Sequence, residues 1–392
     1  MTFSNTQHEG VYEACNRALQ GQRLHRKLPA SNQARLDFTS NDYLGLSRHP
    51  AVIDAACEYT RRYGAGATGS RLLSGNLPCF AELETAIAEA KGTEAALVFN
   101  AGYQANATVL AALTSPTVWQ SEPQLFTDRL NHASLHHACR LNGLRQIRYR
   151  HNDLAHLRDC LEKNAVADRP RFIVAETVFG MDGDCVDMAA LTALADEFGA
   201  FLYLDEAHAT GLYGQHGYGL SSGWWRPAGT TAHRGVAMGT FSKALGGQGA
   251  YIACSAAVRD FLINQCTGFI YSTAPAPASI GAALAAWRLV PQMNATRAAV
   301  FAKADALRAA CQTLGLNTGP STGHIVPLIV GAVDAAEALR DHLQTAGFSG
   351  SLIRPPTVPP HTARIRIAIG AQHGAHDIAH LIESLRDWAR NA

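Results

Sequence analysis

From residue 50 to residue 254, segments with helical periodicity alternate with short apolar runs, and this alternation restricts the possible folds most. Several runs are continuously hydrophobic and lack polar alternation, which is typical of strands buried on both faces of a sheet. Their alternation with helices predicts an α/β fold in which helices sandwich a mostly parallel sheet. The predicted strands are 95–99, 124–127, 146–149, 172–175, 201–204, 235–238 and 250–253, and the predicted helices are 50–63, 79–91, 102–113, 132–141, 153–163 and 188–198.

The pattern changes after about residue 279. Long predicted helices at 277–292, 296–313, 333–345 and 375–390 accompany only three strand-like runs, at 325–330, 350–353 and 364–369. We therefore expect a large α/β domain at 50–279 and a smaller α+β domain at 280–392. Residues 1–49 are expected to form an N-terminal helix and arm, with the helix running to about Lys27 before Pro29.

Composition disfavours two classes of partner and favours one compartment. A formal net charge of +1 provides no basic excess for binding nucleic acid or an anionic membrane surface. The nine cysteines include no Cys-x-x-Cys pair, which favours reduced and mostly buried thiols in the cytoplasm. The first ten residues lack the apolar core of a signal peptide, and no apolar run reaches the roughly 18 residues of a membrane span. Partners must therefore be recognised at local sites.

A glycine-rich segment at 64–69 matches the G-x-G-x-x-G pattern of dinucleotide-binding sites. That pattern requires a strand immediately before it and a helix opening after it. Here a predicted helix precedes it, and it continues into the polar segment 70–75. We therefore expect a flexible loop near a ligand rather than a nicotinamide site.

Asp205 and His208 follow the buried run 201–204, at the edge of the sheet where open α/β folds bind ligands. A buried carboxylate is costly unless it meets a positive partner. Asp205 could instead be a helix N-cap, or Asp205 and His208 could be two ligands of a metal whose further ligands cannot be placed. A third possibility is that the Asp205 carboxylate pairs with a positively charged ring nitrogen of a ligand.

Lys243 lies in a turn rich in glycine and hydroxyl groups, immediately after the run 235–238. Such a lysine could be a solvated surface charge. Its neighbours Thr240 and Ser242 are suited to phosphate oxygens, and the amides of such a turn can bind an anion. An amine that must form an imine has to be partly deprotonated, which burial near other positive charge promotes.

Two further segments also follow predicted strands. In segment 100–106, Gly102 would let a phosphate approach the amides at a helix N-terminus, while Tyr103 could belong either to this site or to the core. In segment 128–134, His132 would by default be a structural histidine.

Taken together, these segments resemble the α-oxoamine synthases, which are pyridoxal 5′-phosphate (PLP) enzymes of fold type I, the aspartate aminotransferase-like fold. The resemblance extends over nearly the whole chain, from Asn-Asp-Tyr-Leu-Gly-Leu at 41–46 to Ala-Arg-Ile-Arg at 363–366. Segments 149–153 and 353–359 agree best with the members that use L-alanine and a pimeloyl thioester.

The resemblance implies a role for each matching residue around the cofactor. Lys243 would hold PLP as a Schiff base, Asp205 would keep its pyridine nitrogen protonated, and His208 would bond its phenolic oxygen. His132 would stack on the ring and also meet substrate. The residues that would help to hold the cofactor, largely at its phosphate, are Gly102, Tyr103 and Thr240.

At the substrate end the resemblance implies Arg354 and Thr357, where an arginine fork suits an amino-acid carboxylate. The family also has an N-terminal arginine, for which Arg26 is favoured over Arg23. One departure from the pattern is Gly180, where the family usually has serine. A side-chain contact at that position is therefore not carried over.

The implied reaction is a decarboxylative condensation of L-alanine with a pimeloyl thioester on coenzyme A or acyl carrier protein, in a cytoplasmic homodimer. Lys243 would act as the general base, and Lys243, His132 and Asp205 would be the catalytic residues. A sister activity that uses glycine stays open, although Pro355-Pro356 argues against it. A non-catalytic subunit is also possible, but such family members lack the lysine that this chain retains.

Overall fold

The computed structural model describes residues 5–28, 36–164, 166, 168–223, 225 and 234–391. Its larger sheet has seven strands in the order β2-β8-β7-β6-β5-β3-β4. β8 runs antiparallel to both β2 and β7, and the other four pairings are parallel, which confirms the predicted mostly parallel sheet. The strands are β2 (Ala95–Phe99), β3 (Gln124–Asp128), β4 (Gln146–Tyr149), β5 (Arg171–Glu176), β6 (Phe201–Asp205), β7 (Gly235–Thr240) and β8 (Ala250–Cys254).

Burial on both faces explains the continuously apolar runs. In β6, Leu202 and Leu204 pack into one hydrophobic cluster, while Tyr203 between them packs into another on the opposite face. Successive side chains of a strand point to opposite faces, so both faces need apolar residues when helices cover both. The helices of this part are α2 (Pro50–Tyr63), α3 (Pro78–Lys91), α4 (Gly102–Leu113), α5 (Pro116–Trp119), α6 (Ala133–Leu141), α7 (Leu154–Asn164), α8 (Met188–Glu197), α9 (Ala256–Gln265), α10 (Thr267–Ile270) and α11 (Pro277–Leu289).

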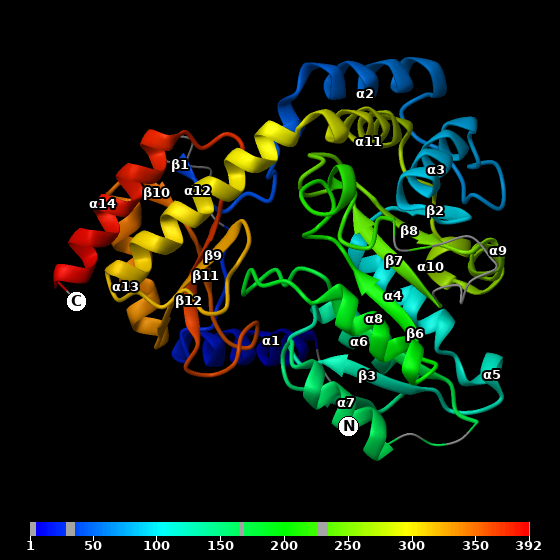
Figure 1. Cartoon of the computed structure of the whole chain (residues 1–392), viewed down its shortest axis with the longest axis horizontal. Coiled ribbons are helices and arrows are strands. Elements are labelled where there is room, and N and C mark those ends of the chain that lie inside the picture. The colour runs from blue at the N-terminus through cyan, green and yellow to red at the C-terminus, as the bar shows by residue number, and fades with distance from the viewer. Residues whose placement is uncertain are drawn as a thin grey trace.

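A smaller antiparallel sheet, in the order β11-β12-β9, forms the C-terminal part with its own hydrophobic cluster. Figure 1 shows α12 in yellow leading from α11 to this part of the molecule. Its elements are α12 (Asn294–Thr313), β9 (Ile325–Gly331), α13 (Val333–Thr345), β10 (Phe348–Ser349), β11 (Ser351–Ile353), β12 (Ala363–Ala368) and α14 (Ala375–Asn391). Short 3₁₀ turns are η1 (Leu46–Arg48), η2 (Gln215–Gly217) and η3 (Val290–Gln292).

The N-terminal segment differs from the prediction in two ways. Helix α1 (Asn5–Gly21) ends before Lys27, because Arg23 adopts a left-handed conformation with φ of 56°. The amides of Leu24 and His25 bond back to the Leu19 carbonyl and close the helix end. The two-residue strand β1 (Leu36–Asp37), which the sequence did not predict, then pairs in parallel with β10.

None of the described helices is both long and apolar enough to cross a membrane. The carboxyl ends of β5, β6 and β7 meet at one edge of the larger sheet, where Glu176 pairs in register with Asp205 and Asp205 with Met238. This edge is where an open α/β sheet binds its ligands.

Candidate active site

Lys243 lies in the loop after β7 and is half-buried rather than a solvated surface charge. Its Nζ lies 2.7 Å from Nε2 of His208. Burial lowers the pKa of Lys243 to about 8, although the carboxylates of Asp205 and Glu176 oppose this and the guanidinium of Arg366 adds to it. An amine with this pKa is partly neutral near physiological pH and can act as a nucleophile or base.

Asp205 ends β6 and is only 3% exposed. One carboxylate oxygen, Oδ2, accepts a hydrogen bond of 2.7 Å from Nδ2 of Asn106, and Oδ1 accepts one of 2.9 Å from the amide of Ala207. The predicted position at the strand edge is therefore observed. Among the described residues, no group of three or more acidic, histidine or cysteine side chains could hold a metal ion.

His132 is joined to Asp205 by a chain of side chains that the sequence did not reveal. Asn106 donates from Nδ2 both to Asp205 and to Oγ of Ser134, at 2.7 and 2.9 Å. The Ser134 hydroxyl lies 2.7 Å from Nδ1 of His132, which caps helix α6. Burial lowers the pKa of His132, with Asp205 opposing and Lys243 adding to the shift.

Gly102 and Thr240 lie side by side, since a Cβ added to Gly102 would be 3.8 Å from Cβ of Thr240. Gly102 opens helix α4, and no side chain caps that helix at Ala101. Uncapped amides at a helix N-terminus favour an anion such as phosphate. The Thr240 hydroxyl bonds the Gly249 carbonyl and lies 2.8 Å from Oγ of Ser242, so two hydroxyl groups border the same position.

Tyr103 is 49% exposed, so the alternative that it belongs to the core is wrong. Its ring meets that of His132 edge to face at 6.2 Å, and its hydroxyl lies 3.0 Å from Nδ1 of His137. The tyrosine therefore stands at the mouth of the site beside the histidine.

Glu176, at the end of β5, is a buried site residue that the sequence reading missed. It accepts hydrogen bonds from the amide of His132 at 2.6 Å and from that of Gly180 at 3.4 Å. Burial and the neighbouring Asp205 raise the pKa of Glu176 to about 8, against the opposing charge of Lys243. The pattern that identified Asp205 could also have identified Glu176, since both are acidic residues directly after a buried apolar run.

Segment 41–46 and strand β12 also reach this site. The Tyr43 hydroxyl lies 2.8 Å from Nδ1 of His208 and 2.9 Å from Oδ1 of Asn41. Arg366 donates to the same hydroxyl and to the Gly180 carbonyl, at 3.1 and 2.6 Å. The small sheet is thereby tied to the loop that follows β5.

The predicted substrate-end residues form a second group. Arg26 donates to Oγ1 of Thr357 at 3.3 Å, whereas Arg23 lies 3.8 Å from Glu337. Arg354 donates to the His25 carbonyl at 2.7 Å and to Glu337 at 3.4 Å. These residues line a cavity of about 960 Å³ between the N-terminal segment, α13 and β11.

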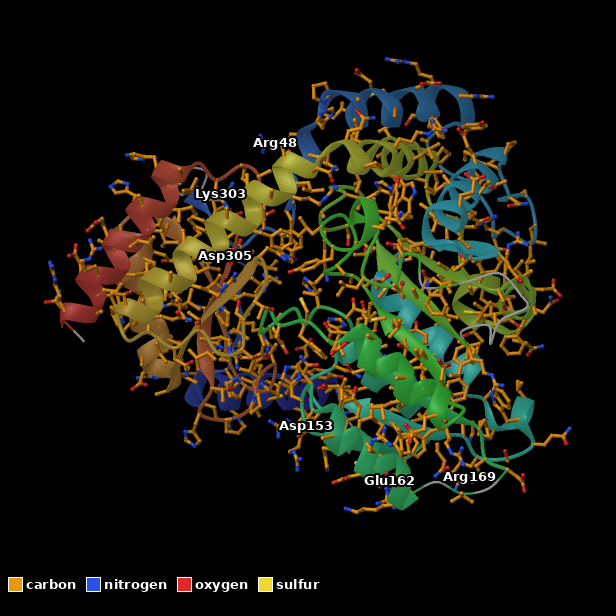
Figure 2. The ribbon with its side chains drawn as sticks, viewed as in Figure 1. Arg48, Asp153, Glu162, Arg169, Lys303 and Asp305 are labelled. Atoms are coloured by element: carbon orange, nitrogen blue, oxygen red, sulfur yellow. The ribbon has the colours of Figure 1, made fainter. Side chains whose placement is uncertain are left out.

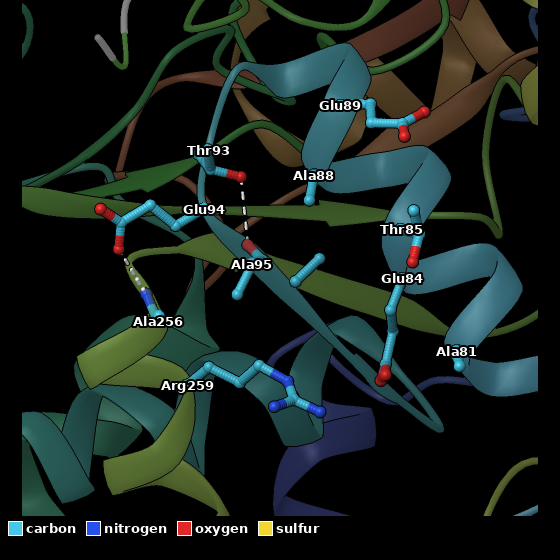
Figure 3. A pocket seen from close by; sticks show the side chains of 11 residues that line it. Ala81, Glu84, Thr85, Ala88, Glu89, Thr93, Glu94, Ala95, Ala256 and Arg259 are labelled. Carbon is cyan, nitrogen blue, oxygen red and sulfur yellow. Dashed lines mark hydrogen bonds between the residues drawn. The ribbon is translucent and has the colours of Figure 1, made fainter. Parts of the chain in front are cut away.

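Other charged groups and cavities lie elsewhere. Arg48, Glu162 and Asp305, which are labelled in Figure 2, are all exposed. A cavity of about 390 Å³ between α3, β2 and α9, shown in Figure 3, is lined by Glu84, Glu94 and Arg259 among others. None of the predicted site residues lines it.

The residues at the sheet edge fit PLP. A partly deprotonated amine, a buried carboxylate, a histidine ring and an anion-binding helix end supply partners for an aldehyde, a pyridine nitrogen, a ring face and a phosphate. The glycine-rich segment at 64–69 lacks the context of a dinucleotide site, as the sequence indicated, because helix α2 rather than a strand precedes Gly64.

Comparison with known proteins agrees with this geometry. Residues 34–385 match the family model for aminotransferase class I and II. An 8-amino-7-oxononanoate synthase of Gluconacetobacter diazotrophicus is 52% identical over 357 residues, which are 91% of this chain and 88% of that protein.

Two solved structures share the fold. Serine palmitoyltransferase of Sphingomonas wittichii has a TM-score of 0.87 at 24% identity, covering 99% of both chains. The 8-amino-7-oxononanoate synthase of Francisella tularensis has a TM-score of 0.76 at 23% identity, covering 92% of this chain and 99% of that one. The motif resemblance is thus confirmed: the chain belongs to the aminotransferase class I and II family and, within it, to the 8-amino-7-oxononanoate synthases.

Proposed function

We propose that the protein is a PLP-dependent acyltransferase that condenses L-alanine with a pimeloyl thioester. The products would be 8-amino-7-oxononanoate, CO2 and the free thiol, in biotin biosynthesis. The observation that carries this proposal is that buried Asp205 ends β6 and Lys243 follows the neighbouring strand β7 at the same sheet edge, with the Lys243 amine 2.7 Å from His208. The proposal is also supported by the 52% identity to a relative named 8-amino-7-oxononanoate synthase.

Each part of the cofactor would meet a residue of suitable chemistry. Lys243 would bind the aldehyde carbon, and Asp205 would face the ring nitrogen. His132 would lie on the ring and His208 at the phenolic oxygen. The residues proposed for the phosphate end are Gly102, Tyr103 and Thr240.

Bound PLP supplies an electron sink for the charge left at the α carbon of the amino acid. Asp205 would hold a proton at the ring nitrogen, since this buried carboxylate has only the neutral donors of Asn106 and Ala207 as hydrogen-bond partners among the described residues. Lys243, with its pKa lowered to about 8, would take the α proton at Nζ near neutral pH. His132 would orient the substrate from the other side.

The substrate end supports an anionic amino-acid ligand and an elongated partner. Arg354 can present a guanidinium fork to a carboxylate, with Arg26 and Thr357 beside it. The adjoining cavity of about 960 Å³ is large enough for an acyl chain. The thioester carrier would be coenzyme A or acyl carrier protein.

The test uses purified protein with PLP. Borohydride reduction should leave the cofactor on a peptide that contains Lys243, and alanine with pimeloyl thioester should give a product of the expected mass. Lys243→Ala should abolish both results. If that variant still gave the PLP-labelled peptide at its normal yield, the assignment of Lys243 would be wrong.

We further propose a homodimer with its active site near the subunit boundary. Leu73 and Tyr271 are 80% and 83% exposed, and the two loops that carry them are joined by a bond from the Ala274 amide to the Gly69 carbonyl. Exposed apolar side chains beside a site are typical of an interface. A monomer in sedimentation with full activity at the same concentration would contradict this.

We also propose that the protein works in the cytoplasm. The chain would consist of three parts, an N-terminal segment at 1–49, a large domain at 50–279 and a small domain at 280–392. The larger and the smaller sheet have separate hydrophobic clusters, which supports two domains, while α11 at the proposed boundary packs with α2 and α3. Limited proteolysis that cuts near residue 280 and leaves two stable pieces would test it.

A further inference from the structure

Gly180 leaves a space that the ring of His208 fills. A Cβ added to Gly180 would lie 2.2 Å from Nε2 of His208 and 2.9 Å from Cε1. Gly180 is not among the glycines with positive φ, so its backbone conformation is open to any residue. The three nearest atoms to that Cβ all belong to the His208 ring, so the ring occupies the place of a side chain.

The backbone at Gly180 cannot readily move away from the ring. Its carbonyl accepts a hydrogen bond of 2.6 Å from Arg366, and its amide donates to Glu176. Any side chain at this position would therefore displace His208 rather than the loop.

Tyr43 determines which nitrogen of His208 carries the proton. Arg366 can only donate, so the Asn41 atom that it contacts at 3.0 Å is the amide oxygen, and the Tyr43 hydroxyl donates its single hydrogen to that oxygen. The Tyr43 oxygen must then accept from Nδ1 of His208, 2.8 Å away. Burial and the charges of Lys243 and Arg366 lower the pKa of His208 well below its usual value, so the ring is neutral.

A neutral imidazole with its hydrogen on Nδ1 has a lone pair on Nε2. That nitrogen lies 2.7 Å from Nζ of Lys243. We propose that Gly180 and Tyr43 together make His208 a hydrogen-bond acceptor for the amine of Lys243, and that Gly180 is thus a positioning residue for this amine. His208 would stabilise the ammonium that forms when Lys243 takes the α proton of the substrate.

This inference rests on the proposed role of Lys243. Among the described residues, the other ionisable groups that interact with Lys243 are Asp205, Glu176, Arg366, His132 and His324. If the Lys243 ammonium loses its hydrogen-bond acceptor, the neutral amine is favoured and the pKa of Lys243 falls. The loss of one charge-assisted hydrogen bond should lower this pKa by about one unit.

The experiment measures the rate at which apo protein captures PLP, followed by the growth of the cofactor's visible absorbance, as a function of pH. The titrations of PLP itself are common to all variants, so differences in the midpoint report on Lys243. Gly180→Ala, His208→Ala and Tyr43→Phe should each lower the midpoint by about one unit. The midpoint of the double variant Gly180→Ala with His208→Ala should be no lower than that of His208→Ala, because no ring remains to be displaced.

Gly10→Ala is the matched control, since a Cβ there meets nothing within 4 Å, and its midpoint should equal that of the wild type. A wild-type midpoint in Gly180→Ala, or a double variant that shows the sum of the single shifts, would overturn the inference. If Gly180→Ala does not fold, Tyr43→Phe decides, and an unchanged midpoint in it overturns the inference. Failure of the wild type to capture PLP would instead refute the proposed function.

Discussion

Glu176 and Asp205 stand side by side as register partners at the ends of β5 and β6, and both carboxylates are buried. Because two like charges side by side in a buried site are costly, Glu176 keeps a proton at neutral pH. Glu176, whose pKa is raised to about 8, holds the proton while its oxygens bind the amides of His132 and Gly180.

Glu176→Gln should therefore change the pH dependence of stability. A raised pKa means that the stability linked to this group is complete below the ordinary value of 4.5 and is lost as pH rises through about 8. Glutamine keeps the neutral form at every pH. We expect the apo variant to gain at least ~1 kcal/mol relative to wild type between pH 5 and pH 9 in urea unfolding. The exposed Glu162→Gln is the control, and a parallel pH profile for Glu176→Gln and wild type would disprove this account.

His151 is predicted to be a half-buried cation. It lies 3.1 Å from Asp128 and 3.3 Å from Asp184, and the hydrogen bonds and charges of these carboxylates outweigh burial and raise its pKa to about 10. The stability it contributes is complete below its ordinary pKa of 6.5 and is lost as pH rises through about 10.

His151→Gln should destabilise the protein by about 3 kcal/mol at pH 7, because two buried carboxylates lose their cation. The difference from wild type should shrink as pH approaches 10. Urea unfolding at several pH values measures this, with the exposed His376→Gln as control. A difference that grew with pH would mean that His151 is neutral.

Asp205→Asn should leave the fold intact but slow α-proton exchange by orders of magnitude, because a neutral amide does not hold the ring nitrogen protonated. Exchange of the alanine α proton with deuterium, followed by NMR, is the measurement. The thermal midpoint of the holo variant checks the fold. Exchange at a nearly normal rate would show that Asp205 does not serve the cofactor.

Strands and most helices could be predicted from the sequence because local pattern determines them. In β6, Leu202 and Tyr203 pack into different hydrophobic clusters, and the continuously apolar sequence of this strand indicates burial on both faces. Proline at the first turn likewise marks α2, α3 and α11. The end of α1 was missed because it depends on the backbone conformation of Arg23 alone.

The candidate site was predictable where a residue directly follows an apolar run, as Asp205 does, or lies in the turn after one, as Lys243 does. The contacts between Tyr43 and Arg366, and between Asn106 and Asp205, join residues about 320 and 100 positions apart. No local pattern reports such pairs. The missing serine at Gly180 was visible in the sequence, but only the structure shows that His208 fills the space.

Alanine should be preferred over glycine, since Arg354 is expected to hold the carboxylate while Pro355 and Pro356 fix the adjacent backbone and so the direction of the methyl group. A single methyl group is worth roughly 10–200-fold in a hydrophobic pocket, so slow use of glycine should remain visible. The measurement is the ratio of kcat/KM for the two amino acids with the same pimeloyl thioester. If glycine matched or exceeded alanine, the chain would be a glycine-using synthase even with every proposed PLP contact correct, because those contacts do not touch the methyl group.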